Sequence, residues 1–127
     1  MAEKKKVLVV DDEPRILRFV TAGLTLDGYT VLSTASGAEA LRLVKSEKPD
    51  IIILDAVMAP MSGFDILDKL RTFSKVPVIL CTARSFMAEE ASKRGADGYL
   101  SKPFIPEELV KKIDEVLEAA KPKKTAT

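Results

Sequence analysis

The chain has 127 residues, is 46% hydrophobic and 31% charged, and carries a formal net charge of +1, which is typical of a single globular domain with an ordinary core. Its one cysteine, Cys81, excludes an intramolecular disulfide, and the lack of histidine excludes a Ser-His-Asp triad and the usual zinc sites. The balanced charge argues against direct nucleic acid contact and the short apolar runs argue against a membrane span, so we expect a cytoplasmic protein whose chemistry uses carboxylates, hydroxyls and lysines.

Short β-branched runs alternate with longer amphipathic segments along the chain. In chain order the pattern predicts a strand at 7–10, a helix from about 12, a strand at 29–34, a helix from 36, a strand at 51–54, a helix from 62, a strand at 77–81, a helix at about 86–94, a strand at 98–100 and a helix from about 106 to 120. The apolar helix positions that we expect in the core are Ile16, Leu17, Val20, Leu24, Leu41, Val44, Phe64, Leu67, Leu70, Leu109, Ile113, Val116, Leu117 and Ala120.

Polar residues and a glycine mark several helix ends. Asp12 is the predicted N-cap of the first helix, Ser36 and Glu39 form a predicted capping box for the second, and Ser62 starts the third. The fourth helix is short and weakly apolar, and Gly95 stops it.

Strict alternation of strands and helices predicts the fold. Nearly continuous apolar strands are typical of a parallel sheet that helices cover on both faces, and the crossovers between such strands are right-handed. We therefore expect an α/β domain over residues 1–120, with a doubly wound five-stranded parallel sheet of strand order 2-1-3-4-5 and five helices. Residues 121–127 form a polar tail, which is either a natural end or the start of a linker.

Polar side chains follow four of the predicted strands, at the sheet edge where ligands bind in open α/β folds. They are Asp11 and Asp12 after the first strand, Asp55 after the third, Thr82 and Ala83 after the fourth, and Lys102 after the fifth. Each has an ordinary explanation alone, such as helix capping. Two carboxylates about 4 Å apart repel by about 4 kcal/mol at an effective dielectric constant near 20, so three at one edge indicate a cation. Mg²⁺ is the hard ion that such oxygens favour, with Mn²⁺ as an alternative.

An aspartate beside such an ion can act as a nucleophile toward a phosphoryl group and become an acyl phosphate. The metal and a lysine would neutralise charge on the transferring group, and a hydroxyl and a backbone N–H would hold its remaining oxygens. The residue types at this edge therefore suit phosphoryl transfer to an aspartate.

Five sequence segments carry a family resemblance. They are Val7–Pro14, Ile52–Asp55, Met61–Gly63, Leu80–Ala83 and Gly95–Phe104. In this order they resemble the motifs of the receiver domain of bacterial two-component response regulators, and the chain is similar to single-domain chemotaxis-type regulators over about residues 5–120.

The resemblance implies a role for each residue at the edge. These roles are phosphoacceptor for Asp55, Mg²⁺ ligands for Asp11, Asp12, Asp55 and the carbonyl of Val57, phosphate-sensing pair for Thr82 and the Ala83 N–H, partner of the phosphoryl group for Lys102, and switch for Thr82 and Tyr99. It further implies a sensor histidine kinase or histidine phosphotransfer protein as donor. An output protein or domain would contact the fourth helix, fifth strand and fifth helix. Such a chain is a switch that catalyses only its own phosphorylation and dephosphorylation, not an enzyme.

The chain departs from the family pattern after the acceptor. The family usually has proline four residues beyond it, where this chain has Ala59 followed by Pro60. Val57 and Arg84 stand at positions that tune the phosphoryl lifetime in the family. Because Val57 cannot position water and Arg84 could shield the phosphate, we expect slow self-dephosphorylation, with a half-life longer than seconds.

Three alternatives compete with this interpretation. A phosphohydrolase resembling the haloacid-dehalogenase group would need a second acidic residue at position 57 and would turn over small phosphate esters. A mononucleotide- or flavin-binding module would need a glycine- or hydroxyl-rich loop where residues 11–14 read Asp-Asp-Glu-Pro, and a flavin would make the protein yellow. A pseudo-receiver is disfavoured because all the chemical positions named above are filled.

Overall fold

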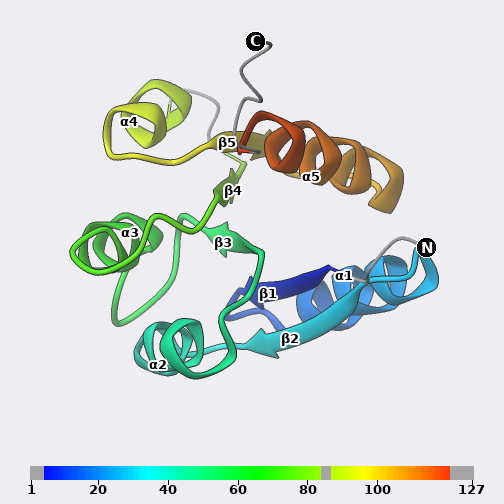
Figure 1. The fold of residues 1–127 in the computed structure, drawn as a ribbon, viewed down its shortest axis with the longest axis horizontal. Coiled ribbons are helices and arrows are strands. Elements are labelled where there is room, and N and C mark those ends of the chain that lie inside the picture. Colours follow the sequence, from blue (N-terminus) through cyan, green and yellow to red (C-terminus); the bar gives the residue numbers. More distant parts are fainter. Residues whose placement is uncertain (1–4, 84–86, 121–127) are drawn as a thin grey trace, which may run out of the picture.

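Five parallel strands form the centre of the computed structural model, which describes residues 5–83 and 87–120 (Figure 1). The elements are β1 (Lys6–Val10), α1 (Pro14–Leu26), β2 (Thr30–Thr34), α2 (Gly37–Glu47), β3 (Ile51–Asp55), α3 (Gly63–Leu70), β4 (Val78–Thr82), α4 (Ala88–Lys93), β5 (Gly98–Ser101) and α5 (Pro106–Ala120). Their order along the chain confirms the predicted alternation. The predicted tail at 121–127, the start of the fourth helix at Phe86, and Arg84 lie outside the described residues.

The strand order is β2-β1-β3-β4-β5, as predicted. All neighbouring strands pair in parallel, with Val10 opposite Leu54 and Asp55 opposite Cys81. Because this register sets the carboxyl ends of the strands nearly level, the residues that end or follow β1, β3, β4 and β5 share one edge of the sheet.

Helices cover both faces of the sheet, with α1 and α5 on one side and α2, α3 and α4 on the other (Figure 1). Side chains alternate along each strand, so Val7 and Val9 pack toward α1 and α5 while Leu8 and Val10 pack toward the other helices. All four are fully buried, and each such aliphatic side chain contributes about 1.5–3 kcal/mol to stability. These two cores hold the strand ends, and therefore the edge, in place.

The predicted helix positions of the core are confirmed in most cases. Val20, Leu24, Val44, Leu67, Leu70, Leu109, Ile113 and Val116 are buried, and Ile16, Leu17, Leu41, Phe64 and Leu117 are partly buried. Ala120 is exposed, because it lies in the last turn of α5, beyond the final buried position at Val116. In the described part of the chain, none of the helices combines the length and the apolar character needed to cross a membrane.

The structure corrects two of the predicted helix caps. The N-cap of α1 is Glu13, not Asp12, and its side chain makes no capping bond. The first helical residue is Pro14, which has no N–H to cap, and the Glu13 N–H donates instead to the Asp11 carboxylate at 2.9 Å. The predicted capping box of α2 forms only by half, since the Ser36 hydroxyl accepts from the Glu39 N–H but the Glu39 carboxylate accepts from a hydroxyl of β2.

The remaining helix ends agree with the predictions. Ser62 caps α3, and Asp65 completes a full capping box with it, which was not predicted. The short helix α4 buries one of its six residues, Ala91. Gly95 follows α4 and has a φ of 98°, a backbone conformation that residues other than glycine rarely adopt.

Candidate functional site

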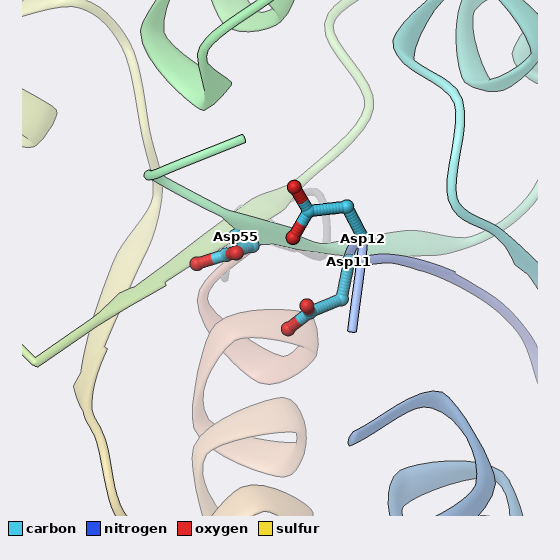
Figure 2. A group of neighbouring side chains, drawn as sticks. All are labelled: Asp11, Asp12 and Asp55. Carbon is cyan, nitrogen blue, oxygen red and sulfur yellow. The ribbon is translucent and has the colours of Figure 1, made fainter. Parts of the chain in front are cut away.

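Three carboxylates meet at the carboxyl edge of the sheet, where β1 and β3 end (Figure 2). One oxygen each of Asp11, Asp12 and Asp55 lies within 4.8 Å of the others. Asp11 and Asp55 are 3% and 7% exposed, whereas Asp12 is exposed to solvent. The structure therefore brings together the three acidic residues predicted from the sequence and leaves one of them open to a ligand.

Lys102, which follows β5, supplies a positive charge to this cluster. Its Nζ donates to Asp11 Oδ2 at 2.9 Å and to Asp55 Oδ1 at 3.2 Å, and its backbone N–H donates to the Thr82 carbonyl at 2.9 Å. The peptide bond between Lys102 and Pro103 is cis. One ammonium thus contacts two of the three carboxylates and leaves their negative charge only partly neutralised.

The environment shifts the pKa of both partners in this contact. Burial, followed by the negative charge of Asp11, raises the pKa of Asp55, although Lys102 and the Val57 N–H at 3.4 Å oppose the shift. Burial alone would lower the pKa of Lys102, but its hydrogen bond to Asp11 and the charge of Asp55 outweigh burial and raise it. At neutral pH Lys102 is therefore a firm ammonium, while the Asp55 carboxylate lies where its charge is unfavourable.

The donor set fits a hard divalent cation. Mg²⁺ takes oxygen ligands and usually keeps several waters, which the exposed side of Asp12 leaves room for. The excess of carboxylates over ammonium gives the electrostatic reason for such an ion, and Mn²⁺ suits the same oxygens. Val57, whose backbone carbonyl was predicted as a metal ligand, stands two residues after Asp55 and is 51% exposed. That carbonyl's role stays a prediction.

Replacing Lys102 with methionine should tighten Mg²⁺ binding by about tenfold, because the ammonium competes for the same carboxylate oxygens. A Mg²⁺ titration followed by NMR or calorimetry would measure the change. Lys69→Met, which removes an exposed lysine of α3, is the matched control and should leave the affinity unchanged. Weaker binding in Lys102→Met would contradict the prediction, because the ordering of the carboxylates by the lysine would then outweigh its competition with the ion.

The predicted phosphate-sensing and switch residues lie on β4 and β5. Thr82 ends β4 and is 2% exposed, Ala83 follows it at the surface, and both stand at the edge that carries the carboxylates. Tyr99 lies on β5 opposite Leu80 and packs partly buried against the core shared with α2, α3 and α4. Thr82 and Ala83 therefore lie at the edge of the site and Tyr99 lies on the neighbouring strand, and the roles that the resemblance implies for them stay predictions.

The loop after Asp55 turns back onto the backbone of the acidic residue itself. The Gly63 N–H donates to the Ala56 carbonyl at 2.9 Å, and the Ala59–Pro60 peptide bond in the loop is cis. A Cβ atom at Gly63 would lie 2.7 Å from the Ala56 Cα and would collide with the Asp55 carbonyl oxygen. The sequence showed Gly63 only as part of a motif; its packing against Asp55 depends on a loop path that periodicity does not reveal.

A second supporting residue, Thr34 at the end of β2, was also missed. Its carbonyl accepts from the Asp11 N–H at 3.2 Å, and its hydroxyl donates to the Glu39 carboxylate at 2.5 Å and accepts from the Ser36 N–H. The edge strand therefore holds the backbone of the acidic loop. A polar residue at the end of a strand was the available signal.

An open apolar groove of about 500 Å³ adjoins the cluster. Its lining residues are Ile16, Phe19, Ala83, Lys102, Pro103 and Phe104. Phe19 on α1 is 47% exposed, which is high for an aromatic ring beside a polar site. The groove gives the carboxylate cluster a hydrophobic border between α1 and the segment that follows β5.

Comparison with known proteins gives the same result throughout. Residues 7–114 match the family model described as the response regulator receiver domain. The chain is 41% identical over 117 residues to the probable transcriptional regulator ycf27 of Porphyridium aerugineum, and 42% identical over 109 residues to the transcriptional regulatory protein KdpE of Mycobacterium tuberculosis. These alignments cover 91% and 84% of this chain but 49% and 48% of those proteins, so the chain spans about half the length of the curated relatives that it matches.

Solved structures resemble the whole domain. The chemotaxis response regulator CheY4 of Vibrio cholerae has a TM-score of 0.84 at 35% identity and covers 90% of this chain and 99% of its own. The Francisella response regulator 1452 receiver domain has a TM-score of 0.86 at 31% identity, covering 93% of this chain and 100% of its own. The matched sequence, the strand order and the acidic edge agree: the chain belongs to the response regulator receiver domain family of two-component systems.

Proposed function

We propose that this chain is a phosphorylation-driven switch in which Asp55 is the phosphoacceptor. One observation carries the proposal: the buried Asp55 carboxylate lies 3.2 Å from the Lys102 ammonium and within 4.8 Å of the other two carboxylates. Its unfavourable charge favours a bound cation, and that cation and the Lys102 ammonium would together neutralise the phosphoryl group of an acyl phosphate formed at Asp55. The donor imidazole comes from outside these 127 residues, which contain no histidine.

The chemistry is a transfer between two groups. An Asp55 carboxylate oxygen forms a bond to phosphorus as the phosphorus–nitrogen bond of a phosphohistidine breaks, and the imidazole keeps the electron pair and takes up a proton. The Lys102 ammonium, the Thr82 hydroxyl and the Ala83 N–H hold the phosphoryl oxygens. Asp11, Asp12, Asp55 and the Val57 carbonyl would hold Mg²⁺, which would supply positive charge to neutralise those oxygens. The chain itself catalyses only this step and the later hydrolysis of the acyl phosphate, in which water attacks and inorganic phosphate leaves, so we class it as a switch and not as an enzyme.

The apolar groove beside the site supports a docking position for the donor. Ile16, Phe19 and Phe104 offer a hydrophobic surface directly next to Lys102, where a sensor histidine kinase or histidine phosphotransfer protein can rest while its imidazole faces Asp55. Such a donor, together with the buried free thiol of Cys81, supports a cytoplasmic location.

The output surface consists of α4, β5 and α5. On phosphorylation, Thr82 moves toward the phosphoryl group and Tyr99 follows it, and an output protein or domain then recognises the changed surface. In this proposal the residues of this chain do not contact nucleic acid directly. Shifting such an equilibrium from 1:99 to 99:1 needs about 5.5 kcal/mol of differential interaction. Slow self-dephosphorylation stays a prediction, since Arg84 lies outside the described residues.

Incubation with acetyl phosphate and Mg²⁺ should label the wild-type protein with one phosphoryl group and leave Asp55→Asn unlabelled. Intact-protein mass spectrometry measures the label, and chelation of Mg²⁺ should abolish it. Asp27→Asn, which changes an exposed aspartate at the end of α1, is the matched control and should be labelled normally. Labelling that survives in Asp55→Asn would show that another residue is the acceptor.

A further inference from the structure

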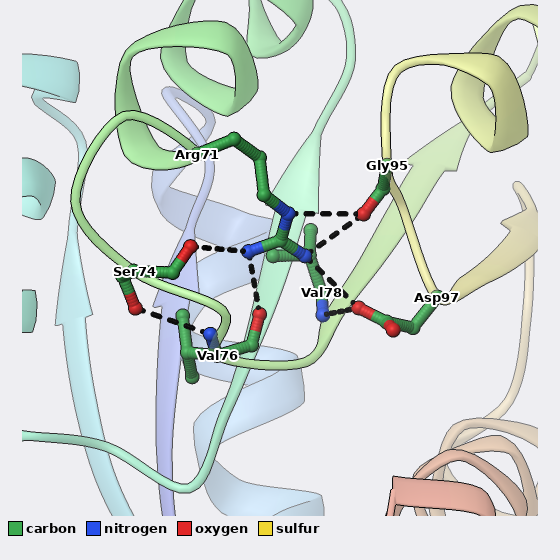
Figure 3. A network of polar contacts seen from close by, with 6 residues as sticks. All are labelled: Arg71, Ser74, Val76, Val78, Gly95 and Asp97. Atoms are coloured by element: carbon green, nitrogen blue, oxygen red, sulfur yellow. Dashed lines mark hydrogen bonds and ion pairs between the residues drawn. The ribbon is translucent and has the colours of Figure 1, made fainter.

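A single arginine, Arg71, connects two loops near the start of β4 (Figure 3). The start of β4 is the end of the strand opposite the carboxylate site. It follows α3 and its side chain is 21% exposed. Nε and Nη2 both donate to the Gly95 carbonyl, at 3.1 and 2.8 Å, and Nη2 also donates to Asp97 Oδ2 at 3.0 Å. Nη1 donates to the carbonyls of Ser74 and Val76, at 3.2 and 2.8 Å. The guanidinium therefore ties the α3–β4 loop to the α4–β5 loop.

The α4–β5 loop is also fixed to the sheet. Asp97 Oδ2 accepts from the Val78 N–H at 2.9 Å, and the Asp97 N–H donates to the Val78 carbonyl at 2.8 Å. Glycine at position 95 allows Arg71 to approach. A Cβ atom there would lie only 3.2 Å from Arg71 Nε, and the backbone at this position has a positive φ, which residues with a side chain rarely adopt. Arg71 and Val78 thus hold the residues directly after α4 against a central element of the core.

The two ends of α4 differ in how they are held. At the C-terminal end, backbone bonds run from Arg94, Gly95 and Ala96 back to Glu90, Ser92 and Ala91. Arg94 also pairs with Asp68 of α3 at 3.1 Å. At the N-terminal end, the N-cap residue Met87 packs partly buried against the core on this face of the sheet, and among the described residues no side chain makes a capping hydrogen bond. Among the described residues, the polar contacts of α4 gather at its C-terminal end, so the N-terminal turn, which apolar packing holds, is the end that moves at lower cost.

We propose that Arg71 is the positioning residue that fixes the C-terminal end of α4, so that a change at the acceptor site displaces the N-terminal turn of this helix. This inference rests on the proposed function. The acceptor lies at the carboxyl ends of the strands and Arg71 lies at their amino ends, about 13 Å away along a five-residue strand. The anchor therefore stays outside the site and serves as the fixed point about which α4 turns.

The planar fork of arginine is essential to this role. Lysine offers one compact ammonium, which cannot contact the Gly95 carbonyl, the Asp97 carboxylate and the α3–β4 loop together. Amide exchange at residues 95–97 in Arg71→Lys should therefore resemble that in Arg71→Met and not that in the wild type. If the positive charge alone were responsible, lysine would restore the exchange of the wild type.

Amide hydrogen exchange tests the proposal on the full 127-residue chain, with Mg²⁺ alone and with Mg²⁺ plus beryllium fluoride as the phosphoryl analogue. In the wild type, beryllium fluoride should change exchange at residues 88–90 and leave residues 95–97 unchanged. In Arg71→Met, exchange at 95–97 should rise by about tenfold, as expected when a local opening loses a charge-assisted hydrogen bond. The analogue should then alter both ends of α4, while its affinity for the acceptor site stays within about twofold of wild type, since Arg71 does not touch that site.

Matched variants keep the outcomes distinct. Arg42→Met removes an exposed arginine of α2 in a surface pair and should respond like the wild type. If Arg71→Met does not fold, Asp97→Asn loses the charge pair but keeps an oxygen for the Val78 N–H, and it should show a smaller change of the same kind. A wild type that responds equally at residues 88–90 and 95–97, or an Arg71→Met variant that behaves like the wild type, overturns the inference. Failure of the wild type to bind beryllium fluoride would instead overturn the proposed function.

Discussion

Gly63→Ala is expected to lower the free energy of unfolding by about 2–3 kcal/mol and to slow phosphorylation of Asp55 by at least about tenfold. The new methyl group would meet the Asp55 carbonyl oxygen and carbon and the Ala56 Cα, all of them backbone atoms that cannot rotate away. Relief requires the loop to move, and with it the backbone of the acceptor. Urea unfolding measures the stability, and the rate of labelling by acetyl phosphate measures the reaction.

The chain offers a close control in Gly37→Ala. Gly37 and Gly63 each follow a serine N-cap as the first residue of a helix, and both are buried. A methyl group at Gly37 would meet the ends of the Ile66 and Met61 side chains, which can shift. Its cost should be below about 1 kcal/mol, with a normal rate of labelling. Equal losses in the two variants would mean that the loop position at Gly63 has no special bearing on Asp55.

Asp55→Asn should raise the free energy of unfolding of the metal-free protein by about 1–2 kcal/mol at neutral pH, a gain typical of removing a functional residue from an unfavourable site. Burial and the charge of Asp11 make the Asp55 carboxylate unfavourable, and asparagine keeps the shape without the charge. Because the folded pKa of Asp55 is raised, stability is fully present below the ordinary pKa of 3.8 and is lost as pH rises through the folded value. The gain should therefore vanish at low pH.

Urea unfolding in the presence of a chelator, repeated at decreasing pH, measures this effect. Asp27→Asn changes an exposed carboxylate for which we expect a difference within about 0.5 kcal/mol at every pH. Mg²⁺ should narrow the difference: at ten times its Kd it stabilises the wild type by about 1.4 kcal/mol, and it should stabilise Asp55→Asn less. A metal-free Asp55→Asn protein that is less stable than the wild type at neutral pH would contradict the prediction.

The sheet and the acidic edge were predictable because both depend on short-range patterns. Four-residue apolar runs such as Ile51–Leu54 indicate buried parallel strands, and in such a sheet the residue after each run must reach the same edge. Strand pairing then brings Asp11 beside Asp55 with no further information. The order of the strands, which local patterns do not determine, followed from the preference for a ligand site where the strand order reverses.

Contacts between loops were not predictable in the same way. Asp12 has the residue type of an N-cap, but the Asp11 carboxylate competes for the local N–H, and the difference depends on the turn before Pro14. Glu39 fits a capping box, yet its carboxylate bonds to the Thr34 hydroxyl of a neighbouring strand. Sequence periodicity describes which residues share a face of one helix or strand. It does not show the hydrogen bonds that these side chains make to residues outside their own helix.

Lys102 has a consequence for the speed of recognition. Because its ammonium already draws the carboxylates of Asp11 and Asp55 together, neither side chain has to search its rotamers when a ligand arrives. The entropy of ordering these groups is spent during folding, so binding does not include that cost. A phosphoryl group that pairs with Lys102 therefore meets side chains that are already ordered, and their rearrangement should not limit the rate at which it binds.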